Sequence, residues 1–169
     1  MCSSDLKSSA GRRIADLLRW KFRDTDKLVE KKEGMTVSDI FASGGEQLFR
    51  SSEAAALREV ASGTRTVVAC GGGTPCSEEN MSVMKSTGLT VYLRLPADIL
   101  VSRLLRSRSR RPLLRDTGDA ELHARVQEML DTRSRWYEQA DLVIDCENVT
   151  DEEMTSMIAD LVRSRGAYL

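Results

Sequence analysis

Apolar residues along the chain follow two alternating patterns. Short apolar runs, which favour buried strands, alternate with longer segments in which apolar residues recur every three or four positions, as on one face of a helix. The runs predict strands around Phe22 and at 66–70, 89–95 and 142–144. Strands separated by helices favour a parallel sheet covered on both faces. The sequence therefore predicts an α/β protein.

Helices are predicted between and after these strands. Ile14, Leu17 and Leu18 indicate a first helix beginning at about Ser9, and residues 27–61 are predicted to be mostly helical with a break at 43–45. The remaining helices are predicted at 77–86, at 96–105, at 119–139 and around Met154, Met157, Ile158 and Leu161. No repeat, linker or low-complexity segment divides the chain, so residues 1–169 are predicted to form a single domain.

Composition narrows the class of protein. The net charge is −1, with 25 basic and 26 acidic residues, so no overall field attracts nucleic acid or anionic lipid. The sequence contains no apolar run of about 18 residues, so no membrane-spanning helix is predicted. The four cysteines show neither a CxxC pair nor metal-ligand spacing, and Cys70 and Cys76 are interpreted as packing residues. We expect a cytoplasmic monomer with reduced thiols.

Lys7, Ser8 and Ser9 match the second half of a phosphate-binding loop. Such a loop places a lysine on the terminal phosphates and a hydroxyl on Mg²⁺, and it needs glycines so that backbone N–H groups can surround the phosphates. No glycine precedes Lys7. By itself, so short a string is explained by chance occurrence.

Two carboxylates follow the first predicted strand. Asp24 and Asp26 alternate, so on a strand they share a face and reach the end of the sheet where α/β proteins bind ligands. One can bind Mg²⁺ and the other a substrate hydroxyl. An acidic turn that caps the next helix is the alternative.

Arginines mark two candidate anion sites. Glu46, Arg50 and Glu53 share one helix face, which indicates either a solvated ion-pair network or a guanidinium oriented for a planar carboxylate. Arg133 lies on the apolar stripe of its helix. It either extends along that surface or holds an anion in a cleft.

Two further segments carry possible chemistry. Gly71, Gly72 and Gly73 follow a buried strand, which indicates a tight turn or a close approach of backbone to a ligand. Arginines crowd the stretch 103–115. Without interleaved aromatics this stretch fits a lid that closes over phosphates better than a nucleic-acid surface.

Six strings in order resemble the shikimate kinase family: KSSAGRRIADLL, FRDTDKLVE, FASGGEQLFRSSE, VVACGGG, RRPLL and RSRWYEQAD. The resemblance spans residues 7 to about 163. It implies a P-loop kinase-type three-layer fold, with a five-stranded parallel sheet and an arginine-rich lid at about 106–118. The implied reaction transfers the γ-phosphate of ATP to the 3-hydroxyl of shikimate, in aromatic amino-acid biosynthesis.

The resemblance also implies residue roles. Lys7, Ser8 and Ser9 would bind the nucleotide with Arg106 and Arg111, and Lys7 and Arg111 would also be catalytic. Ser8 and Asp24 would bind Mg²⁺, and Asp26 would orient the attacking hydroxyl. The remaining substrate-binding residues would be Arg50, Glu53, Gly71, Gly72, Gly73 and Arg133.

The chain departs from the family's pattern before Lys7. The family has a central first strand and a glycine-rich loop there, whereas this chain reads MCSSDL. We interpret residues 1–6 as artefactual, because the end of a common sequencing adapter encodes this string when read from a GTG start codon. We expect the chain as written to be inactive. The alternatives are a shikimate-binding pseudokinase and a related small-molecule kinase such as a gluconate kinase.

Overall fold

The protein was analysed as a computed structural model, which describes residues 4–106 and 118–165. Four short strands lie in it, β1 (Lys21–Asp24), β2 (Thr66–Ala69), β3 (Val91–Arg94) and β4 (Leu142–Asp145). β1 pairs with β2 and β3 pairs with β4, both in parallel. The predicted α/β class and parallel pairing are confirmed, but the described strands form two separate pairs rather than one sheet.

Seven helices accompany these strands in the described ranges: α1 (Ser4–Leu18), α2 (Thr25–Glu33), α3 (Val37–Ala61), α4 (Glu78–Thr87), α5 (Ala97–Arg106), α6 (Asp119–Tyr137) and α7 (Asp151–Ser164). The break predicted at 43–45 is confirmed as a kink at Gly45, where φ is 69°. This left-handed backbone conformation suits glycine.

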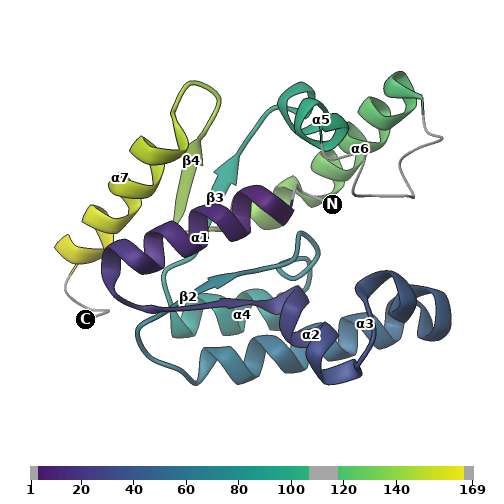
Figure 1. Cartoon of the computed structure of the whole chain (residues 1–169), viewed down its shortest axis with the longest axis horizontal. Helices are drawn as coiled ribbons and strands as arrows, with labels where there is room; N and C mark the ends of the chain where they lie inside the picture. The colour runs from purple at the N-terminus through teal and green to yellow at the C-terminus, as the bar shows by residue number, and fades with distance from the viewer. Residues whose placement is uncertain (1–3, 107–117, 166–169) are drawn as a thin grey trace.

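The helix α1 connects the two halves of the molecule. Figure 1 shows it crossing the centre, with β1, β2 and helices α2–α4 on one side and β3, β4 and helices α5–α7 on the other. It contacts β1, β2 and α7. Ala10 and Ile14 are buried in the main hydrophobic core with residues of α5, α6 and α7. The position of Lys7 and Ser8 is therefore fixed by packing further along the same helix.

The start of α1 corrects one prediction. The helix begins at Ser4 rather than at about Ser9. Its positive N-terminal end, where unpaired backbone N–H groups can attract anions, therefore lies before Lys7. No glycine interrupts residues 4–10, so helical hydrogen bonding extends through the positions where a phosphate-binding loop would end.

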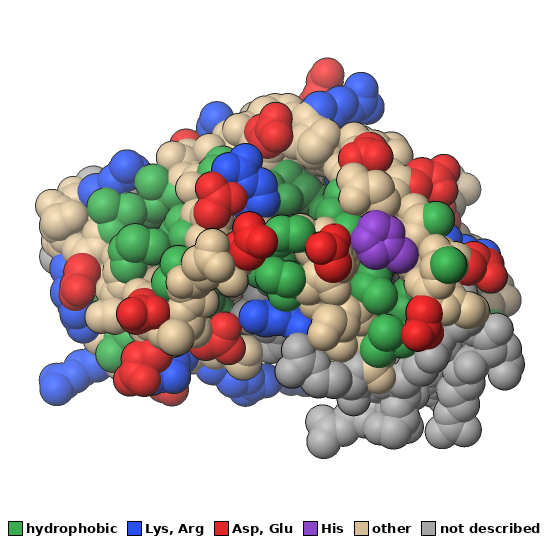
Figure 2. All heavy atoms as spheres, turned by 90° about the horizontal axis from the view of Figure 1, so that it is seen from above, with side chains coloured by type: hydrophobic (Ala, Val, Ile, Leu, Met, Phe, Trp, Pro, Cys, Tyr) green, Lys and Arg blue, Asp and Glu red, His purple; other side chains and the backbone are tan. Residues whose placement is uncertain are grey.

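Charge is mixed on the surface shown in Figure 2, where acidic and basic side chains of the described residues are interspersed with apolar ones. No described helix is both long and apolar enough to cross a membrane. Among the described cysteines, Cys70, Cys76 and Cys146 are free thiols.

Candidate active site

The carboxyl ends of β1 and β2 lie side by side, because Asp24 is in register with Ala69. Asp24 is the N-cap of α2, and its Oδ1 accepts hydrogen bonds from the backbone N–H groups of Asp26 and Lys27 at 3.1 and 3.3 Å. Asp26 is therefore in the first turn of a helix, not on a strand. The prediction that both carboxylates share a strand face is wrong, although both lie at the predicted edge of the sheet.

The two residues of the phosphate-loop string contact this edge. Ser8 donates a hydrogen bond from Oγ to Oδ2 of Asp24 at 2.5 Å. The ammonium group of Lys7 donates to the carbonyl oxygen of Cys70. A hydroxyl and a carboxylate in contact supply two oxygen ligands of the kind that Mg²⁺ prefers. Ser9 is exposed.

Asp26 is half-buried and crowded by other acids. Burial raises the pKa of its carboxyl, and the nearby charges of Asp24, Glu53 and Glu30 raise it further, while the positive charge of Lys7 lowers it. Asp26 is therefore close enough to Lys7 for an electrostatic interaction, and the net effect of its surroundings is to increase the proton affinity of Asp26. Such a carboxylate is a better hydrogen-bond acceptor for an alcohol than an exposed aspartate.

Glu53 is the most deeply buried acid described, at 1% exposure. Its Oε2 accepts a hydrogen bond from Nη1 of Arg50 at 2.8 Å, and its Oε1 accepts one from the hydroxyl of Thr74 at 2.7 Å. Arg50 also donates to Glu46. The predicted single helix face is confirmed, and Arg50 is held by an acid on either side.

The glycine triplet approaches these side chains closely. A Cβ at Gly71 would lie 2.7 Å from Oε1 of Glu53 and 2.8 Å from Oδ1 of Asp26. A Cβ at Gly73 would lie 2.1 Å from Nη1 of Arg50. A larger residue at Gly71 or Gly73 would therefore enter the space of Asp26, Glu53 or Arg50, and that side chain would have to move.

Two residues that the sequence did not single out, Thr25 and Tyr137, hold this glycine loop. The buried Thr25 accepts a hydrogen bond from the backbone N–H of Gly71 and donates to the carbonyl of Ala69. Tyr137 donates from its hydroxyl to the carbonyl of Gly72 at 2.6 Å. Each contact joins segments at least 44 positions apart, so no local signal could have indicated it.

A cavity of about 760 Å³ opens beside the loop. Arg50, Gly73 and Arg133 line it together with residues of α3, α4 and α6. Arg133 therefore faces a cleft that also contains Arg50. Cys76 lines the same cavity, which corrects its interpretation as a packing residue. Burial raises the pKa of its thiol, whereas the positive charges of Arg133 and Arg50 lower it.

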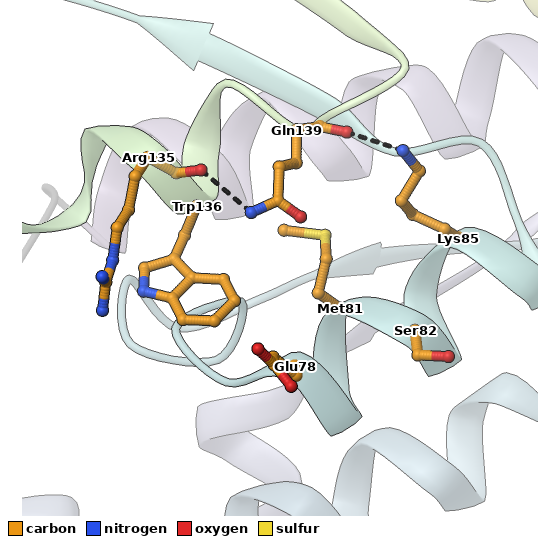
Figure 3. A pocket seen from close by; sticks show the side chains of 7 residues that line it. All are labelled: Glu78, Met81, Ser82, Lys85, Arg135, Trp136 and Gln139. Atoms are coloured by element: carbon orange, nitrogen blue, oxygen red, sulfur yellow. Dashed lines mark hydrogen bonds between the residues drawn. The ribbon is translucent and has the colours of Figure 1, made fainter.

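A second cavity, of about 470 Å³, lies between α4 and the last turn of α6. Figure 3 shows Trp136 and Arg135 on one side of it and Met81 and Glu78 on the other, with Lys85 donating to the carbonyl of Gln139. Trp136 and Arg135 line both cavities. None of the predicted site residues whose side chains the structure describes lines this second cavity.

Most of the predicted lid lies outside the described residues. Arg111 lies outside the described residues, as does the side chain of Arg106, the last residue of α5. No cluster of three or more potential metal-ligating His, Cys, Asp or Glu side chains occurs within 4–106 and 118–165.

Comparison with known proteins identifies the family. A family model described as shikimate kinase matches residues 6–163. Shikimate kinases from Parabacteroides distasonis and Thermodesulfovibrio yellowstonii are each 36% identical, over 86% and 90% of this chain and 84% and 86% of theirs.

Solved structures agree with the sequence comparison. A shikimate kinase structure from Bacteroides thetaiotaomicron superposes with a TM-score of 0.86 at 32% identity, covering 93% of this chain and 92% of that one. One from Acinetobacter baumannii, in complex with shikimate, gives 0.85 at 30% identity, covering 97% and 90%. Since both sequence and fold match over most of their lengths, the chain belongs to the shikimate kinase family, which uses ATP as co-substrate.

Proposed function

We propose that this protein phosphorylates shikimate with ATP. One observation carries the proposal: Lys7, Asp26, Glu53 and Arg50 form a continuous series from the phosphate-loop string to the cavity. Asp26 and Glu53 each lie within 3 Å of the position that a Cβ at Gly71 would take. Burial raises the pKa of Asp26, whereas the positive charge of Lys7 lowers it. At the other end of the series, Glu53 forms an ion pair with Arg50. This series would link a phosphate site to a carboxylate site across the length of a small substrate.

The cavity supplies the carboxylate site. Arg50 and Arg133 line it from α3 and α6, and guanidinium groups bind carboxylates through paired, charge-assisted hydrogen bonds. A ligand held this way would place its ring beside the glycine loop, where backbone rather than side chains forms the wall. Its hydroxyl would then lie toward Asp26.

Asp26 would hydrogen-bond the attacking hydroxyl. Phosphoryl transfer passes through a loose transition state, so positioning and charge stabilisation dominate. The proton of the alcohol leaves late in such a reaction, and the main task of Asp26 is alignment of the oxygen. The raised pKa of Asp26 strengthens its attraction for that proton.

The phosphate end would be formed by Lys7, Ser8 and Asp24. Mg²⁺ would be held by the Ser8 hydroxyl and the Asp24 carboxylate, which are in contact, and it would supply neutralising charge to the phosphates. Lys7 would leave the carbonyl of Cys70 to reach the terminal phosphates. Arg106 and Arg111 remain proposed lid residues.

Residues 4–6 do not support phosphate binding in their present form. They form the first turn of α1 without a glycine, so the backbone there is helical and does not curve around a phosphate as a glycine-rich loop does. We therefore propose that turnover of ATP requires an apolar strand and a glycine-rich loop before Lys7. Adding both in place of MCSSDL is expected to increase the turnover of ATP.

The test is a coupled assay for ADP with shikimate, quinate and gluconate as acceptors, on the chain with the added strand and loop. Turnover with shikimate is expected to exceed that with the other two. Firm binding of ATP without phosphorylation of shikimate would contradict the proposed reaction. Preference for gluconate would identify a different small-molecule kinase.

A shikimate-binding pseudokinase is the second candidate. The helical conformation of residues 4–6 favours it for the chain as printed. Calorimetry separates the two: a pseudokinase binds shikimate but not ATP–Mg²⁺, even after the loop is added.

A further inference from the structure

The guanidinium of Arg50 presents two edges to two different acids. Its Nη1 donates to the buried Glu53 at 2.8 Å. Its Nε and Nη2 donate to a single oxygen, Oε1 of Glu46, at 3.3 and 3.2 Å. The inner contact is the shorter one and involves a glutamate that is 1% exposed. The outer contact is longer and involves a glutamate that is 69% exposed.

The outer edge is the one available to a ligand. Arg50 and Glu46 both line the 760 Å³ cavity, whereas Glu53 does not. Parallel binding of a carboxylate needs two N–H groups on one edge of the guanidinium. Because Nη1 is engaged with Glu53, the Nε and Nη2 edge is the natural place for such binding, and Glu46 already occupies it.

We propose that Glu46 is a tethered competitor for the substrate's carboxylate, which occupies its place on Arg50 and must be displaced when substrate binds. This inference rests on the proposed function of the cavity as a carboxylate site. Displacement is easy, because an exposed pair of this spacing contributes little to stability. After displacement, the charge of Glu46 remains at the rim of the cavity and opposes the bound anion.

Removal of a competitor strengthens substrate binding, whereas removal of a residue that merely orients Arg50 would weaken it. Removing the charge of Glu46 should strengthen binding of shikimate, by about two- to tenfold for one charge–charge interaction near a protein surface. The gain should be absent for shikimate methyl ester, which has no carboxylate charge. Glu53 would still hold Arg50 in place.

The experiment compares Glu46→Gln with the unaltered protein by titration calorimetry, using shikimate and its methyl ester without nucleotide. Glu59→Gln is the matched control, because Glu59 lies on the same helix, is exposed, and lines neither cavity. The control should leave affinity unchanged. Circular dichroism melts verify that each variant is folded.

Tighter binding of shikimate by Glu46→Gln, with no gain for the ester, is the expected result. Weaker or unchanged binding of shikimate would overturn the inference and assign Glu46 an orienting role or none. If the unaltered protein binds neither compound, the proposed function of the cavity fails, and this inference fails with it.

Discussion

Glu53 holds Arg50 from the buried side, with Oε2 of the glutamate 2.8 Å from Nη1 of the arginine. Burial alone would lower the pKa of Arg50, but hydrogen bonds and charge from Glu53, and then from Glu46, outweigh it and raise that pKa. The guanidinium is therefore charged and oriented before any ligand enters.

Replacement of Glu53 by glutamine should weaken both the fold and the site. The side chain is 1% exposed while Arg50 is 36% exposed, so Arg50 retains access to water and the loss is limited to about 1–3 kcal/mol of unfolding free energy. Urea unfolding measures this loss, and calorimetry should show weaker binding of shikimate. An unchanged midpoint and unchanged affinity would refute the role assigned to Glu53.

Replacement of Arg133 by alanine should act on one substrate. Charge-assisted hydrogen bonds contribute about 1.5–3 kcal/mol each, so the loss of two is expected to raise KM for shikimate by roughly 10²-fold or more, with KM for ATP little changed. Steady-state kinetics on the chain with the added strand and loop provide the measurement. Arg125→Ala is the control, since Arg125 lies on the same helix with a side chain that is 68% exposed. Equal increases in both KM values would argue against a carboxylate-binding role.

Replacement of Gly73 by alanine should displace Arg50. The new methyl group would lie 2.1 Å from Nη1 of the guanidinium, and a flexible side chain can move away with little cost to the fold. We expect shikimate affinity to fall at least tenfold, while the thermal midpoint changes by only a few degrees. Gly88→Ala tests for a general effect of losing a glycine, because a Cβ at Gly88 meets nothing within 4 Å. Retained affinity in the Gly73 variant would show that Arg50 does not need its present position.

Asp26 should make stability depend on pH in the direction opposite to most carboxylates. Burial raises its pKa in the folded state above the unfolded value, so the folded protein binds the proton more tightly. Stability is then greater at low pH and decreases as pH rises from the unfolded pKa of 3.8 through the folded one.

Asp26→Asn removes the loss of stability that ionisation of the buried Asp26 carboxyl causes. At neutral pH the variant should melt higher than the unaltered protein by a few degrees, since about 1 kcal/mol shifts Tm by roughly 2–4 °C in a chain of this size. The difference should disappear in acid, and phosphorylation of shikimate should be lost. Scanning calorimetry at several pH values measures the effect, and a variant that is less stable at neutral pH would contradict the sign of the shift.

Much of the site was determined by the sequence, because it depends on local geometry. Glu46, Arg50 and Glu53 face the same way since helical spacing places i, i+4 and i+7 on one face, and the family resemblance assigned Arg133 to the same ligand as Arg50. The glycine triplet was also indicated locally, because three glycines after a strand require a structural reason.

Only the tertiary structure decided which groups meet. Lys7 contacts the carbonyl of Cys70 across 63 positions, and Tyr137 contacts Gly72 across 65. The burial that raises the pKa of Asp26 likewise depends on segments remote in sequence. The spacing within one helix is imposed by backbone hydrogen bonds, whereas these contacts depend on how separate helices and strands pack, and no periodicity along the chain records that.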